Sequence, residues 1–134
     1  MKEMKIVLGE NQIVEAHYKG HVIVTDQPEK DGGENSQASP FDLFLASIGT
    51  CAGYYVKSFC KQRGIPEKGI DIVQRMYIDE MTRMIGTIEI DIVLPPDFPE
   101  KYKESVVKAA GACTVKKHIA QAPEFVVNTV SKSA

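Results

Sequence analysis

The sequence has no strong excess of charge of either sign and no long apolar run. Its 134 residues carry a formal net charge of −2, whereas a surface for nucleic acid or anionic membranes needs a concentrated basic face. The longest weakly polar stretch, residues 43–56, contains Ser47 and Thr50 and is too short to span a bilayer. No Lys/Arg-rich leader precedes an apolar segment at the N-terminus, so we expect no signal peptide. We therefore expect no nucleic-acid partner and no membrane partner.

Cysteine is scarce and forms no metal-binding pattern. The chain has three cysteines, an odd number that does not make a secreted disulfide framework. We therefore expect a cytoplasmic protein with free thiols. No C-x-x-C pair occurs, His17 and His21 flank a predicted turn, and His118 lies far along the chain. We expect no bound metal.

The first quarter of the chain is predicted to be β-structure. Runs of β-branched residues at 5–8, 12–18 and 21–25 are separated by turn residues. Residues 25–38 then lose all periodicity and contain Gly32 and Gly33. A loop of this length indicates either function or mobility.

A long helix is predicted from Pro40 to about Arg63. Ser39 is a good N-cap, and Asp42 can complete a capping box with it. Apolar residues recur at helical spacing and also fill much of the remaining circumference, so we expect the helix to be buried on most sides. Two glycines four residues apart on one face, Gly49 and Gly53, would let another backbone come close.

The second half of the chain is predicted to alternate strands and helices. Strands are expected at 70–78 and 85–92, a helix from Pro99 to about Ala109, a short helix at 113–120 and a last strand at 125–130. The order βββ-α-ββ-α-α-β favours an α+β fold with an antiparallel sheet. We expect a single domain over residues 1–134.

Cys51 and Cys113 are the candidates for chemistry. Cys113 falls at the break between the last two helices, where backbone N–H groups and the nearby Lys116 and Lys117 favour a thiolate. Cys51 lies about three turns into an apolar helix, where a free cysteine most often packs as a small hydrophobe. Cys60 is nine residues further on, about half a turn away in rotation, and is expected to face elsewhere and to be packing or incidental.

Two segments resemble those of a known family. The segment GGENSQASPFDLFLASIGTCAGYYV resembles the OsmC/Ohr family of osmotically inducible and organic-hydroperoxide-resistance proteins. In that family a small loop leads into Ser/Asn-Pro and a Leu-rich central helix that carries the first cysteine. GACTVKKHIA resembles the second signature, a late cysteine that starts a short helix. The order of elements also matches, and the resemblance implies an OsmC-like fold assembled as an intertwined homodimer.

The resemblance further implies a thiol peroxidase that needs no bound cofactor. Cys51, as thiolate, would attack an organic hydroperoxide and become a sulfenic acid, and Cys113 would resolve it to a disulfide that an external dithiol reduces. Family members pair the first thiol with an N-terminal arginine and with a glutamate after the helix-opening proline. Here no arginine precedes Arg63, and Phe41 follows Pro40. The resemblance leaves the activating cation open among His17, Lys19, His21, Arg75 and Arg83.

A second hypothesis belongs to a different class of function. The same fold could serve a non-catalytic protein that binds a small apolar or electrophilic ligand, because fold alone does not determine function. The acidity of Cys51 separates the two hypotheses. A lowered pKa favours a peroxidase in oxidative-stress defence, and an inert thiol favours the binding protein. Local surroundings favour ionisation of Cys113, whereas the resemblance favours Cys51 as the nucleophile.

Overall fold

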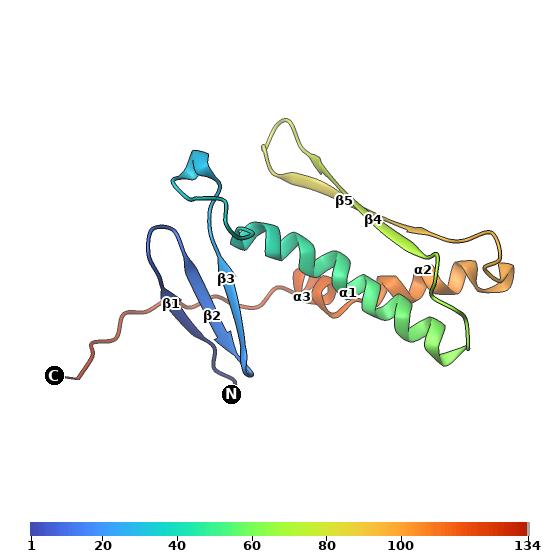
Figure 1. Cartoon of the computed structure of the whole chain (residues 1–134), viewed down its shortest axis with the longest axis horizontal. Helices are drawn as coiled ribbons and strands as arrows, with labels where there is room; N and C mark the ends of the chain where they lie inside the picture. The colour runs from blue at the N-terminus through green and yellow to red at the C-terminus, as the bar shows by residue number, and fades with distance from the viewer. Residues whose placement is uncertain (134) are drawn as a thin grey trace. The chain divides into compact units, whose positions relative to one another are not determined.

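The structure, a computed structural model, describes residues 1–133, which form two compact units. The first unit is Met1–Ser47, and the second begins at Ile48. The long helix α1 starts in the first unit and continues in the second (Figure 1). The elements in chain order are β1 (Lys5–Leu8), β2 (Val14–Tyr18), β3 (His21–Thr25), the 3-10 helix η1 (Glu29–Asp31), α1 (Pro40–Gln62), β4 (Asp71–Ile78), β5 (Ile85–Val93), the 3-10 helix η2 (Glu100–Tyr102), α2 (Lys103–Gly111) and α3 (Thr114–Ala120).

The first unit contains an antiparallel meander, β1–β2–β3. Its three strands confirm the three strands predicted from the sequence. β2 starts later than predicted because the residues before it form the turn. The N–H of Gly9 donates to the carbonyl of Ile13, and the N–H of Ile13 donates to the carbonyl of Glu10.

The loop after β3 is organised around the carboxylate of Asp26, which is 1% exposed. The carboxylate accepts the Ser36 hydroxyl at 2.7 Å and the backbone N–H groups of Gln27, Glu34 and Ser36 at 2.8, 3.3 and 3.0 Å. The Ser36 hydroxyl, followed by these N–H groups, lowers the pKa of Asp26 to about 2. The segment predicted as a long loop therefore contains η1 and folds around one buried carboxylate.

α1 begins with the predicted capping box. The N–H of Asp42 donates to the Ser39 hydroxyl at 3.2 Å, and the N–H of Ser39 donates to the Asp42 carboxylate at 3.4 Å. The helix buries one stripe only, while Phe41 and Tyr54 are more than half exposed. The chain's own elements cover one face of α1, and burial on most sides stays a prediction for a protein that pairs with a second copy. The buried residues are Ile48, Ala52, Val56, Phe59 and Cys60.

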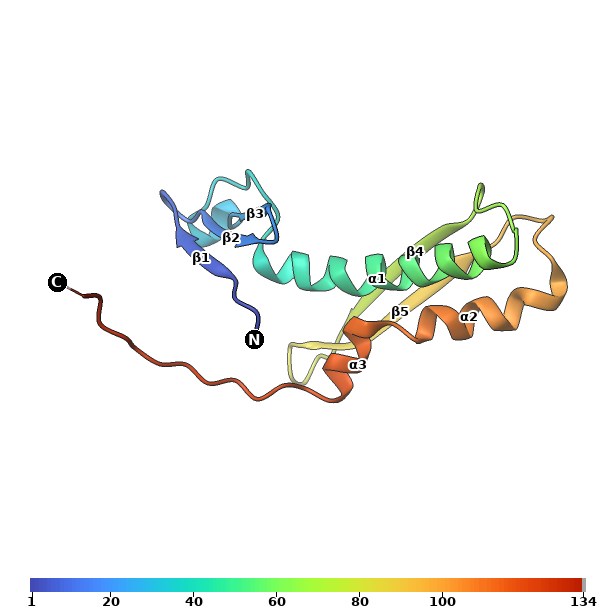
Figure 2. The ribbon, with the colours of Figure 1, turned by 90° about the horizontal axis from the view of Figure 1, so that it is seen from below.

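The second unit packs the part of α1 from Ile48 onward with the β4–β5 hairpin and α2 (Figures 1 and 2). In the antiparallel hairpin, Asp71 lies opposite Val93, and a register shift falls at Tyr77/Ile78. The core holds α1 residues, Phe98 and the α2 residues Val106 and Ala110, with isoleucines of the hairpin packed against it. No helix among residues 1–133 has the length and apolarity needed to cross a membrane.

The end of the chain differs from the prediction. The last strand predicted at residues 125–130 is absent, and within the described chain no residue after α3 belongs to a helix or strand. Val126, Val127 and Val130 are 70%, 94% and 91% exposed. A strand needs a neighbour to satisfy its backbone groups, and this segment pairs with none in the described chain. The observed order is βββ-α-ββ-α-α, with two separate antiparallel sheets.

Candidate functional site

The two cysteines singled out from the sequence lie in contact. Cys51 projects from α1 and Cys113 is the residue before α3, and their thiols are hydrogen-bonded. Both are reduced. Cys51 is half-buried, whereas Cys113 has no exposed surface. A small reagent from solution therefore meets Cys51 first.

The surroundings of Cys51 favour its thiolate. Burial alone would raise the pKa of this thiol, but three hydrogen-bond donors outweigh burial and hold the pKa below its ordinary value. The donors are the Cys113 thiol and the backbone N–H groups of Val115 and Thr114. All three donors are neutral, so the stabilisation comes from hydrogen bonding to the charged sulfur.

The surroundings of Cys113 have the opposite effect. Burial raises the pKa of Cys113, and the hydrogen bond that it donates to Cys51 raises it further. The N–H groups of Lys116 and Val115 act in the other direction without reversing the shift. The local prediction that Cys113 is the more acidic thiol is therefore wrong. The start of α3 does supply N–H donors to Cys113. However, Cys113 is buried and stays protonated, and its S–H donates a hydrogen bond to Cys51.

A second contact ties the same two elements together. The phenolic oxygen of Tyr55 lies 2.8 Å from Oγ1 of Thr114, and Nδ1 of His118 lies 2.8 Å from the Thr114 carbonyl. Sequence reasoning missed Tyr55 and Thr114. The available signal was spacing, because Tyr55 is one helical turn after Cys51 and Thr114 directly follows Cys113.

Cys60 lies in the hydrophobic core. It is 1% exposed and belongs to the cluster around Val56 and Phe59. Burial, and to a lesser extent the charge of Glu67, raises the pKa of Cys60. The prediction that Cys60 is packing is confirmed.

Two of the five cations considered as partners of Cys51 form ion pairs with other residues. Arg75 on β4 forms ion pairs with Asp91 and with Glu89, the latter at 3.4 Å, and the hydrogen bond with Asp91 raises the pKa of Arg75. His17 lies 2.9 Å from Glu15. The remaining three lie in or beside turns: Lys19, His21 and Arg83.

An apolar cavity of about 760 Å³ lies in the second unit. Its wall includes Ile48, which is three residues before Cys51 on α1, and Gly111 and Lys116, which lie on either side of Cys113. Asp91 also lines it and is paired with Arg75. The other lining residues are Ile88, Ile90, Ile92, Val93, Val107, Ala110 and Ile119.

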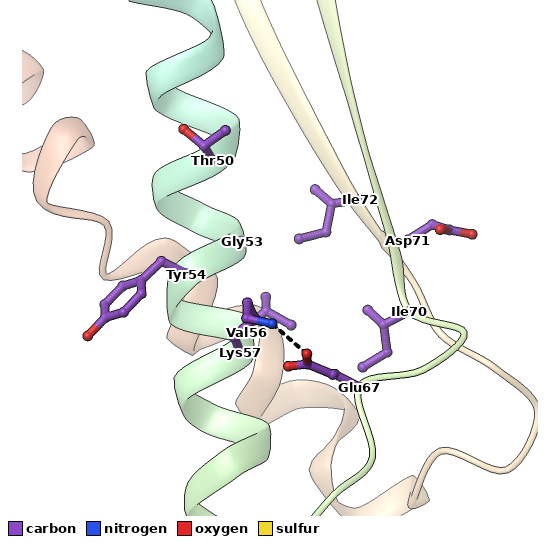
Figure 3. A pocket seen from close by; sticks show the side chains of 9 residues that line it. All are labelled: Thr50, Gly53, Tyr54, Val56, Lys57, Glu67, Ile70, Asp71 and Ile72. Atoms are coloured by element: carbon purple, nitrogen blue, oxygen red, sulfur yellow. Dashed lines mark hydrogen bonds and ion pairs between the residues drawn. The ribbon is translucent and has the colours of Figure 1, made fainter. Parts of the chain in front are cut away.

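A second hollow, of about 500 Å³, lies between α1 and the start of β4 (Figure 3). Ile70 and Ile72 point from the hairpin side toward α1, and Lys57 forms an ion pair with Glu67. Neither cysteine of the thiol pair lines this hollow. Within residues 1–133 no group of three or more His, Cys, Asp or Glu side chains is placed to hold a metal ion. The hydrogen-bonded thiols are therefore the candidate site.

Comparison with solved structures shows the fold. A protein of Psychrobacter arcticus 273-4 superposes with a TM-score of 0.72 at 20% identity, covering 87% of each chain. A hypothetical protein of Aquifex aeolicus VF5 gives a TM-score of 0.69 at 25% identity, covering 91% of this chain and 89% of that one. An organic hydroperoxide resistance protein OsmC of Legionella pneumophila gives 0.55 at 17% identity, covering 89% and 88%.

The family follows from the sequence match. No curated protein matches this sequence. The family described as OsmC-like protein matches residues 33–128, a span that includes α1, the hairpin and both cysteines of the thiol pair. The α+β architecture with antiparallel sheets and a long helix agrees with the structural matches. The chain belongs to the OsmC-like protein family.

Proposed function

We propose that this protein reduces organic hydroperoxides with Cys51 as the attacking thiol and Cys113 as the resolving thiol. The observation that carries the proposal is the contact between the two thiols, in which a half-buried Cys51 accepts hydrogen bonds from Cys113 and from backbone N–H groups. Hydrogen bonding of this kind stabilises a thiolate, which is the nucleophilic form of cysteine. The OsmC/Ohr resemblance supports the substrate class.

The reaction follows in three balanced steps. The Cys51 thiolate attacks the terminal oxygen of ROOH, the O–O bond breaks, and the alkoxide leaves as ROH after taking up a proton. Cys51 is thereby oxidised to a sulfenic acid. The Cys113 thiol then attacks the Cys51 sulfur, forming a disulfide and releasing water. An external dithiol reduces the disulfide and is itself oxidised.

The position of Cys113 suits the resolving role. A resolving thiol needs to reach the sulfenic acid, and Cys113 is already in hydrogen-bond contact with Cys51. Its pKa is raised above the ordinary value, first by burial and then by the bond to Cys51. It therefore remains a thiol while Cys51 reacts.

We also infer that the protein assembles as a homodimer. α1 leaves Phe41, Phe44 and Tyr54 56%, 43% and 63% exposed, and the valines of the segment after α3 are exposed as well. Exposed apolar surface of this kind marks an interaction site, and two-fold homodimers are the commonest oligomers. A second copy would cover both features.

One observation favours the alternative of a non-catalytic binding protein. The cavity of about 760 Å³ is lined mainly by isoleucine and valine side chains, and such a cavity suits a small apolar ligand. In that case the thiols would be oxidised only incidentally. Turnover decides between the two functions, because a binding protein consumes no peroxide catalytically.

Peroxide consumption by the pure protein tests the proposal. Hydrogen peroxide and cumene hydroperoxide are each supplied with dithiothreitol as the dithiol, and the loss of peroxide is followed over many turnovers. We expect faster consumption of the organic hydroperoxide. Cys60→Ala is the matched control, because it removes the core thiol alone and should retain the rate. Consumption of at most one equivalent per chain would contradict catalysis and favour the binding protein.

A further inference from the structure

The hydrogen bond between Tyr55 and Thr114 joins the two elements that carry the thiols. Its oxygen atoms are 2.8 Å apart. Tyr55 leaves α1 on the same side as Cys51, one turn further on, and Thr114 directly follows Cys113. At the same junction the N–H groups of Thr114 and Val115 donate to the sulfur of Cys51. One side-chain bond and two backbone donors thus meet between α1 and α3.

Apart from the buried Cys113 at its start, α3 has little apolar packing of its own. α3 has seven residues, and none of them is buried, so apolar packing contributes little to its position. Hydrogen bonds weaken steeply as the donor angle departs from linear, so a small rotation of α3 would remove its N–H groups from the sulfur. A specific contact at the first residue of α3 is therefore well placed to control those donors.

We propose that Tyr55 and Thr114 are a positioning pair that fixes the start of α3 against α1 and aims the N–H groups of Thr114 and Val115 at Cys51. The inference rests on the proposed function only in taking Cys51 as the nucleophile. The pair acts through the backbone and touches no substrate, so its effect is on the acidity of Cys51.

The charged and titratable groups around the junction do not depend on the Tyr55 hydroxyl. Cys113 is the titratable side chain whose interaction shifts the pKa of Cys51. On α1, Lys57 is paired with Glu67. On α3, His118 bonds the Thr114 carbonyl, and the ammonium of Lys116 lies 4.0 Å from where a Cβ on Gly111 would be. Removing the Tyr55 hydroxyl changes none of these charges.

Alkylation of Cys51 as a function of pH tests the proposal. The reagent is iodoacetamide, and mass spectrometry quantifies the labelled Cys51 peptide in the full-length chain. Tyr55→Phe removes one hydroxyl, and we expect it to raise the midpoint of the alkylation profile by about half a pH unit, which corresponds to the partial loss of a hydrogen bond. Thr114→Val should give the same shift, whereas Thr114→Ser keeps the hydroxyl and the wild-type midpoint. Tyr54→Phe is the matched control, because it removes the neighbouring hydroxyl.

The outcomes separate positioning from a merely structural role. A lower melting temperature with an unchanged alkylation midpoint in Tyr55→Phe and Thr114→Val would overturn the proposal. If Tyr55→Phe does not fold, Thr114→Val and Thr114→Ser decide it alone, since Thr114 is exposed. The assay contains no peroxide, so its result is independent of turnover. A shifted midpoint in a protein that consumes no peroxide supports the positioning pair and refutes the peroxidase.

Discussion

The buried thiol of Cys113 donates its hydrogen to the sulfur of Cys51. Burial raises the pKa of both thiols. The hydrogen bond then moves the two pKa values apart, because it raises the pKa of Cys113 further and lowers that of Cys51. One thiol is thereby prepared to ionise while its neighbour stays protonated. Two predictions follow directly from this pair.

Oxidation should link the two contacting thiols. One equivalent of cumene hydroperoxide is expected to join Cys51 to Cys113 within one chain, because the thiols are already in contact. Peptide mapping without reductant locates the bridge. Cys60 should stay reduced, since it is buried in the core, and it should be alkylated once the oxidised chain is unfolded. A bridge that contains Cys60, or no bridge, contradicts the two-thiol mechanism.

Serine variants should separate the roles of the two thiols. Cys51→Ser should lower peroxide consumption by roughly 10³-fold or more, because the nucleophile is lost. Cys113→Ser should still form a sulfenic acid on Cys51, trapped with dimedone, but should turn over slowly for want of a resolving thiol. Retention of the full rate by Cys51→Ser would show that the assignment is wrong.

The carboxylate of Asp26 should contribute to stability in a pH-dependent way. Its pKa is lowered from 3.8 to about 2, so the contribution is fully present above about pH 4 and disappears as the pH falls through about 2. Asp26→Asn should therefore be less stable than the wild type at pH 7, and the difference should shrink between pH 4 and pH 2. Thermal unfolding across this range measures it. The exposed Asp31→Asn is the control and should show no such convergence.

The two glycines of α1 should respond differently to alanine. A Cβ on Gly53 would make an ordinary contact with Ile72 at 3.5 Å, whereas one on Gly49 would overlap Oε1 of Gln74. Gly53→Ala should stabilise the protein by about 0.5–1 kcal/mol through helix propensity. Gly49→Ala should be less stable than Gly53→Ala by about 1 kcal/mol, because Gln74 has to move and its contacts are disturbed. Urea unfolding measures both, and equal stabilities would contradict the close approach of Gln74.

Sedimentation at low micromolar concentration tests assembly. We expect a homodimer, because α1 exposes an apolar face and the segment after α3 exposes three valines. Val127→Lys places a charge in that segment and should weaken the dimer, whereas Lys132→Gln changes a charge nearby and should not. A folded wild-type monomer at this concentration would contradict the assembly.

The sequence correctly predicted those elements whose structure depends on residues close together in the chain. The capping box of Ser39 and Asp42 forms as predicted, as do the first three strands and the β4–β5 hairpin. Each of these depends on turn chemistry or periodicity within a few residues. The predicted strand at 125–130 failed for a different reason. β-branched composition indicates a preference for extended structure, but a strand also needs a partner edge, which composition does not specify.

The candidate site was only partly accessible from the sequence. Cys51 and Cys113 were identified, but the direction of their pKa difference was wrong when judged from neighbours in the chain alone. The lysines after Cys113 suggested an acidic thiol there, whereas the N–H groups of Thr114 and Val115 donate to Cys51 on a different helix. A contact of this kind depends on tertiary packing. Asp26 was missed because its partners are the hydroxyl of Ser36, ten residues later in the chain, and backbone N–H groups, which every sequence contains.

The place of the thiol contact in the chain links redox state to folding. The segment between Cys51 and Cys113 contains the β4–β5 hairpin and α2, so a disulfide would enclose most of the second unit in a covalent loop. Closing a loop of roughly 60 residues removes chain entropy from the unfolded state worth about 4 kcal/mol. Oxidised chains should then unfold at a higher urea concentration than reduced ones. By thermodynamic reciprocity, the disulfide would be harder to reduce in the folded protein than in the unfolded chain. The external dithiol would therefore have to be a strong enough reductant to regenerate the two thiols in the folded protein.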